Sequence, residues 1–147
     1  MFMNQYVYGV LKAVHVLSAV IWVGGMFFAY LVLRPALAVL EPPQRIALHT
    51  QVFQRFFKIV WHVMPLIILS GLAIIFGTFG GMAGVRWNVH AMLLLGLVMA
   101  GVFLALYFGP YRTFRAQPGP VPLDAIRKLI GVNLVLGLLT TAIAVLG

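Results

Sequence analysis

The first hydrophobic stretch of the chain, residues 8–33, reads YGVLKAVHVLSAVIWVGGMFFAYLVL. Its one charged residue is Lys12. The hydrocarbon core of a bilayer is about 30 Å thick, and a helix needs roughly 20 apolar residues to cross it. The stretch is too long for the core of a signal peptide, and no small-residue cleavage motif follows it. We therefore expect it to form a transmembrane helix of the mature protein.

Three further stretches meet the same length criterion, namely residues 56–78, 88–108 and 126–146. Connections rich in Gly and Pro separate the four stretches. The chain is 63% hydrophobic and 8% charged, whereas soluble domains carry about 25% charged residues. The sequence therefore predicts an all-α, integral membrane four-helix bundle, up-and-down, that forms a single domain over residues 1–147.

Positive charges gather on two of the three connections. These cations are Arg34, Arg45, Arg55 and Lys58, followed by Arg112, Arg115, Arg127 and Lys128. The opposite side of the bundle has only Lys12 and Arg86. Positively charged connections stay in the cytoplasm, so we expect both termini on the outer, periplasmic side of a bacterial inner membrane. Residues 35–53 are only mildly apolar, and we expect them to form a short interfacial helix that carries His49.

The composition excludes several classes of site. The chain has no cysteine, which excludes disulfides, thiolate metal sites and iron–sulfur clusters,. Its acidic residues, Glu41 and Asp124, are too few for a calcium or magnesium cage or for a two-carboxylate hydrolase,. The net charge of +8 does not indicate nucleic acid as a partner, because the cations lie at the ends of apolar stretches,.

Three of the four histidines lie within predicted spans, and each has a cation about one helical turn before it. The pairs are Lys12 with His15, Lys58 with His62 and Arg86 with His90. Ionisable residues are costly inside a membrane and usually serve a function there. A histidine with a cation nearby suits a bound anionic cofactor such as haem b. The alternative is structural, since cations near helix ends reach toward the interface and a histidine can hydrogen-bond across helices.

Helical spacing groups these residues on shared faces. The face of the first span comprises Lys12, His15, Ser18, Trp22, Gly25 and Met26. The face of the third span comprises Arg86, His90, Leu94, Leu97 and Gly101. The fourth span has a small, polar strip of Asn133, Gly137, Thr140 and Thr141. We expect all three faces to point into the bundle.

The heights of the histidines favour one pairing. The first and third helices run parallel, and His15 and His90 both fall on the outer half of the membrane. His62 lies roughly 14–18 Å away in height, at 1.5 Å per residue. We therefore expect the haem iron between His15 and His90, with the propionates toward Lys12 and Arg86. Ser18, Trp22 and Gly101 would line the macrocycle. His62 is the second candidate for a metal ligand, at a separate site, or binds no metal.

Copper is the alternative metal, because methionine and imidazole ligands suit Cu(I). The candidate residues are His62 with Met64 and His90 with Met92. Residues two apart on a helix point about 200° apart, however, and do not share a face. Met26 and Met99 are interpreted as packing residues, since methionine commonly fills gaps in a core.

Several motifs resemble the membrane domain of the copper resistance protein D (CopD) family. They are Leu11-Lys12-Ala13-Val14-His15, Ile21-Trp22-Val23-Gly24-Gly25, Leu33-Arg34-Pro35-Ala36-Leu37, Arg55-Phe56-Phe57 and Leu69-Ser70-Gly71-Leu72. Trp87-Asn88-Val89-His90-Ala91-Met92 is similar to the Trp-Leu-His-Ala-Lys motif of the related HemJ-type protoporphyrinogen oxidases. The lysine of that motif is Met92 here, so the oxidase activity does not carry over. The resemblance implies haem b on the histidine that matches His15, and the copper resistance family implies a role in copper handling.

Three functions remain open at this stage. The first is a haem b protein of the membrane, in electron transfer or in a haem-dependent oxidation linked to a quinone, a porphyrin or a redox protein. The second is copper transport or copper resistance. The third is an accessory subunit of a membrane complex, and a homo-oligomer is also open. Ser18 lies one turn from His15, but no carboxylate in the membrane can orient that histidine, which argues against a catalytic triad.

Overall fold

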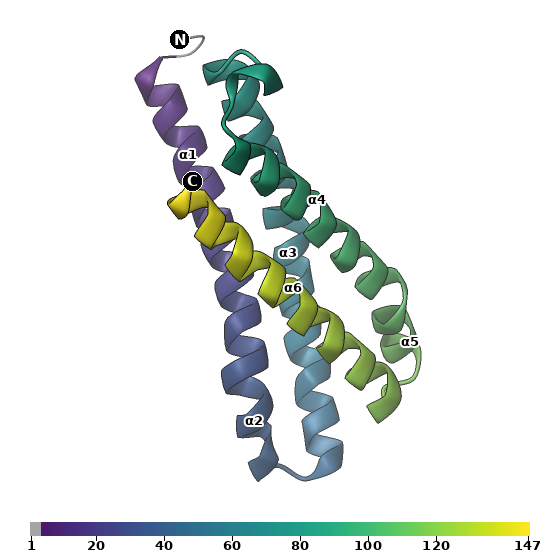
Figure 1. Cartoon of the computed structure of the whole chain (residues 1–147). Helices are drawn as coiled ribbons and strands as arrows, with labels where there is room; N and C mark the ends of the chain where they lie inside the picture. Colours follow the sequence, from purple (N-terminus) through teal and green to yellow (C-terminus); the bar gives the residue numbers. More distant parts are fainter. Residues whose placement is uncertain (1–3) are drawn as a thin grey trace.

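The computed structural model describes residues 4–147, and four long helical segments account for most of them. Figure 1 shows the first two segments side by side, with the last two crossing them. The four segments are Gln5–Val39, Pro42–Thr78, Trp87–Ala116 and Pro120–Leu146, and each is long and apolar enough to cross a membrane. The prediction of an all-helical bundle with four spans is confirmed.

The first segment changes its helical form along its length. Helix α1 (Gln5–Phe27) starts at Asn4, whose side-chain oxygen accepts a hydrogen bond from the Val7 amide at 2.9 Å. A π-helical turn, η1 (Phe28–Leu33), and two short pieces, α2 (Arg34–Ala36) and η2 (Leu37–Val39), follow. Pro35 has no N–H to donate to the preceding turn, which explains why the helix departs from regular α form there.

Helix α3 (Pro42–Thr78) forms the second segment and corrects one prediction. Residues 35–53 do not form a separate interfacial helix, since residues 42–53 are the first turns of α3. Glu41 and Gln44 make a capping box at its start, where Pro42 is compatible with the helix,. Its 37 residues span about 56 Å,. The helix is therefore much longer than the hydrocarbon core, and it continues through Pro65.

The second half of the chain forms a helical hairpin. A loop with a short helical turn, η3 (Met82–Gly84), leads into α4 (Trp87–Phe108). Gly109 and Pro110 interrupt the segment before α5 (Pro110–Ala116), and α6 (Pro120–Leu146) runs back. The fourth segment begins six residues earlier than predicted. Gly147 approaches Asn88 at the start of α4, so the end of α6 lies in the same half of the bundle as the first turns of α1 (Figure 1).

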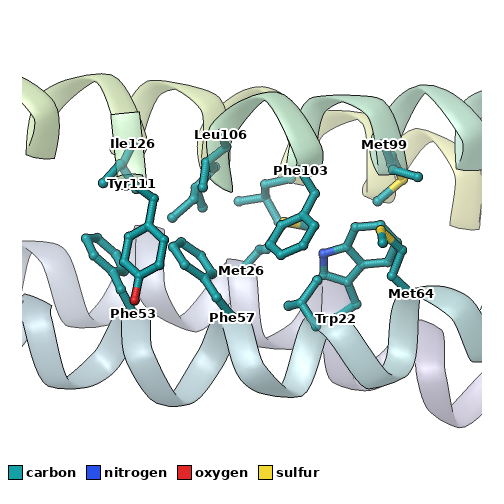
Figure 2. Packing of buried hydrophobic residues seen from close by; sticks show 14 of the residues in the cluster. Trp22, Met26, Phe53, Phe57, Met64, Met99, Phe103, Leu106, Tyr111 and Ile126 are labelled. Atoms are coloured by element: carbon teal, nitrogen blue, oxygen red, sulfur yellow. The ribbon is translucent and has the colours of Figure 1, made fainter. Parts of the chain in front are cut away.

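Aromatic side chains fill the core toward the opposite end. Phe57 of α3 lies 5.2 Å from Phe53, 5.8 Å from Phe103 and 4.7 Å from Tyr111, measured between ring centroids. Figure 2 shows these rings between α3 and the second half of the chain, with Leu106 and Ile126 against them. Many large apolar residues outside this core are exposed, and they form the surface that lipid covers in a membrane,. The chain is a multi-pass membrane protein.

Candidate functional site

His15 of α1 is fixed against α3 through its Nδ1 atom. Nδ1 lies 2.9 Å from the main-chain carbonyl oxygen of Ile67 and 3.1 Å from the Oγ atom of Ser70. A carbonyl oxygen only accepts hydrogen bonds, so Nδ1 carries the proton and Nε2 keeps a lone pair. Metal-binding histidines commonly donate their second ring N–H to a carbonyl group in this way. These contacts occupy Nδ1 and leave Nε2 as the ring nitrogen that is available to another partner.

The turn of α3 that faces His15 is built from small residues. Ser70 is buried, and its Oγ donates to the carbonyl oxygen of Ile67 at 3.2 Å. A Cβ atom on Gly71 would lie 3.0 Å from Cε1 of His15, so a larger residue here would push the ring slightly away from α3. Ser70 and Gly71 were not predicted as part of the site. The sequence feature that could have identified them is the presence of two adjacent small residues within an otherwise apolar span.

The predicted inner face of the first span is confirmed for three residues that follow His15 in the chain. Ser18, Trp22 and Met26 of α1 are all buried. Met64 of α3 and Met99 of α4 belong to the same core. Figure 2 shows Met64 and Met99 at the Trp22 end of this core, and Met26 nearer to its centre. Three helices thus each supply a buried thioether to one core, and those of Met64 and Met99 lie at its Trp22 end (Figure 2).

The contact between α4 and α6 places polar groups next to Met99. Asn133 is buried, and its Nδ2 donates to the main-chain carbonyl oxygen of Met99 at 3.1 Å. Its Oδ1 atom is buried without a partner. The Oγ1 of Thr140 lies 4.0 Å from the sulfur of Met99. Asn133 and Gly137 are both buried, which confirms the predicted inner face for these two residues of the fourth span.

The predicted inner face of the third span is wrong. Arg86, His90, Leu94, Leu97 and Gly101 do lie along one stripe, but all five are exposed. A Cβ atom on Gly101 would meet open space. The buried residues of α4 are Met99, Ala100, Phe103 and Leu106. Nearly every position of α4 is apolar, so the sequence holds no contrast between an inner and an outer face.

The structure consequently does not bring His90 and Arg86 to the face that carries His15. Lys12 is also exposed, and its Nζ atom lies 6.0 Å from the centroid of the Tyr8 ring. Of the residues predicted to surround a cofactor, His15, Ser18 and Trp22 share one buried or half-buried face. A cofactor role for the other residues stays a prediction.

His62 lies on the outside of α3. Its ring is exposed, and its Nδ1 donates to the carbonyl oxygen of Lys58 in the same helix at 2.7 Å. Met64 is buried on the opposite side of α3, as the 200° offset predicts. His62 and Met64 therefore do not form a joint site.

His49 is buried near the start of α3, at the opposite end of the bundle from the first turns of α1 (Figure 1). Its Nδ1 donates to the carbonyl oxygen of Arg45 at 3.0 Å, and its ring lies 5.3 Å from the ring of Phe53. No group of three or more His, Cys, Asp or Glu that could hold a metal occurs among residues 4–147.

Comparison with known proteins gives a family. The family model for copper resistance protein D matches residues 50–146, which include most of α3 and all of α4 and α6. No curated protein and no solved structure matches the chain. The matched range contains the Arg55-Phe56-Phe57 and Leu69-Ser70-Gly71-Leu72 motifs. The bacterial inner membrane fits this family. The chain therefore belongs to the copper resistance protein D (CopD) family.

Proposed function

We propose that this protein binds Cu(I) within the membrane and takes part in copper transport or copper tolerance. The family match supports copper as the metal. The match favours copper, the alternative metal in the sequence analysis, over haem b, the cofactor that the sequence alone favoured.

The observation that carries the proposal is the orientation of His15. Its Nδ1 proton points to the Ile67 carbonyl oxygen. The other ring nitrogen, Nε2, then has a lone pair that can bind a metal ion, and the ring lies on a half-buried face. Imidazole binds copper in this neutral form. The pairing with α3 also holds the ring in place before the ion arrives, because it joins two helices rather than two turns of one helix.

Buried thioethers supply the second kind of ligand. Met26, Met64 and Met99 come from three different helices and lie in one core, two of them beside Trp22 (Figure 2). Thioether sulfur is a soft ligand that prefers Cu(I) to harder cations. His15 lies two helical turns before Trp22 on α1. We propose that the ion first binds His15 and then the methionines, since conduction requires several weak sites rather than one tight site.

A copper assay in cells tests this function. Deleting the gene should change the copper content of the cells and their growth on copper. The wild-type chain should restore both, and so should His62→Ala, because His62 faces outward. His15→Ala should restore neither at equal protein level. Equal copper content and tolerance with and without the gene would contradict the proposal.

A haem b protein is the second candidate, and the same histidine supports it. A carbonyl-bound Nδ1 is also the arrangement of a haem ligand,. Haem would supply one-electron chemistry, and the chain would bind and orient it as a membrane oxidoreductase. A visible spectrum of protein purified with ample haem, oxidised and then reduced, tests this candidate. A sharp reduced α-band that His15→Ala abolishes and His62→Ala keeps would favour haem, and a flat spectrum would exclude it.

A further inference from the structure

A cavity lies at the end of the bundle where the first helical segment ends and α3 begins, far along both helices from His15. It measures about 400 Å³, within the usual range for small-ligand sites. The last turns of the first helical segment and the first turns of α3 and α6 form its walls. We call it the arginine pocket, and its polar lining residues are Tyr30, Arg34, Arg45, His49 and Arg127.

Three arginines thus line one cavity, and no acidic residue is among its lining residues. The two acidic residues of the chain are Glu41 and Asp124, and neither lines the pocket. Asp124 pairs with Lys128 on the exposed surface at 3.1 Å, and Glu41 caps α3. Guanidinium groups stay charged in proteins. The three arginines therefore repel one another until an anion enters the pocket.

Each arginine is held by the fold, and each keeps donors free. Arg45 donates through Nε to the Leu40 carbonyl oxygen at 2.7 Å and through Nη2 to the Ala38 carbonyl oxygen at 3.2 Å. Its other Nη hydrogens remain available. The guanidinium of Arg34 stacks over the Tyr30 ring at 5.1 Å.

The guanidinium group of Arg127 on α6 is partly buried beside this pocket. Its Nε atom is buried and has no hydrogen-bond partner. A buried donor that belongs to a charged group is strongly unfavourable when it stays unpaired. Arg127 lines the cavity together with Arg34 and Arg45, so its partly buried positive charge lies beside theirs. An anion in the cavity would offset that charge.

We propose that the arginine pocket binds a phosphate group, carried either by an anionic phospholipid headgroup or by free inorganic phosphate. Arginine forks match the oxygens of phosphate, and several forks around one cavity favour it over a single carboxylate. The charge bias of the chain predicts that this end faces the cytoplasm. Basic pockets between transmembrane helices on that side bind lipid headgroups. Leu31, Leu37 and Leu123 give the pocket apolar walls that suit the start of an acyl chain.

Binding to the full chain in a neutral detergent, stripped of lipid, tests this proposal. The probes are dioctanoyl-phosphatidylglycerol, dioctanoyl-phosphatidylcholine and inorganic phosphate, with affinity measured from thermal shifts. Phosphatidylglycerol or phosphate should bind, and Arg127→Gln and Arg34→Gln should each lower that affinity at least tenfold. Arg112→Gln should stay within twofold of wild type, because Arg112 is exposed and does not line the pocket. Binding of phosphatidylglycerol alone identifies a headgroup, and equal binding of phosphate identifies the free ion.

Modification of the wild-type protein with phenylglyoxal, mapped by mass spectrometry, does not depend on how the variants fold. The bound probe should protect Arg34 and Arg127 at least fivefold and leave Arg112 unprotected. Three results would overturn the proposal. They are no binding of either anionic probe, equal binding of phosphatidylcholine, and loss of affinity in Arg112→Gln as large as in Arg127→Gln.

Discussion

The Nδ1 atom of His15 on α1 lies 2.9 Å from the main-chain carbonyl oxygen of Ile67 on α3. This single contact joins two transmembrane helices and fixes which nitrogen of the imidazole is free. An intramembrane histidine without such a partner would have to satisfy both nitrogens in some other way. The contact therefore links the packing of α1 on α3 to the chemistry that we propose for His15.

Gly71 should control how His15 sits against α3. In Gly71→Ala the added methyl group would lie 3.0 Å from Cε1 of His15, so the ring must move. We expect the affinity for Cu(I) to fall about tenfold, which is the low end for changes that misplace a metal-binding histidine. Gly96→Ala is the matched control, because its methyl group meets open space. Unchanged affinity in Gly71→Ala would show that the position of the ring does not matter.

Asn133 should be replaceable by an apolar residue of similar size. Its Oδ1 atom is buried without a partner, which is unfavourable by about 1–3 kcal/mol,. The bond from Nδ2 to the Met99 carbonyl oxygen contributes about 0.6 kcal/mol, the average for such bonds in membranes,. We expect Asn133→Leu to leave the free energy of unfolding unchanged or to raise it by about 1 kcal/mol. A loss above about 2 kcal/mol would mean that Oδ1 binds something in the native protein.

Phe57 should dominate the stability of the aromatic core. It is buried, and its ring packs against Phe53, Phe103 and Tyr111. We expect Phe57→Ala to lower the free energy of unfolding in mixed micelles by about 2–3 kcal/mol. This is less than the 3–5 kcal/mol typical of soluble cores, because unfolding in a membrane mimic moves the ring into lipid rather than water. Phe76→Ala, at an exposed position, should change it by less than about 0.5 kcal/mol,.

The sequence predicted the four spans well because length and hydrophobicity are direct consequences of crossing a bilayer. It also predicted part of the buried faces of α1 and α6, although Lys12 and Thr141 on those predicted faces are exposed. Ser18, Asn133 and Gly137 mark those faces, because small and polar residues are poorly suited to lipid contact,.

The same approach failed for α4, where His90 and Gly101 form a stripe that faces outward. A helix that is apolar on every side gives no signal about its orientation, which then depends on shape. The packing of Met99 and Phe103 against the other helices decides it.

Two features of the site could not be read from the sequence. The partner of His15 is a main-chain carbonyl oxygen, and any apolar residue at position 67 would provide one. The arginine pocket depends on the close approach of Arg127 to Arg34 and Arg45, from which it is far apart in the chain. In the sequence these arginines indicate only the orientation in the membrane.

The most direct test of the account is a Cu(I) titration of purified protein against a competing chelator. Wild type and His62→Ala should bind Cu(I) with the same affinity, because the exposed His62 donates to its own helix. His15→Ala should bind at least tenfold more weakly while keeping the same thermal midpoint within a few degrees. If His15→Ala binds Cu(I) as tightly as wild type, or if His62→Ala loses as much affinity, then His15 is not the copper ligand of this protein.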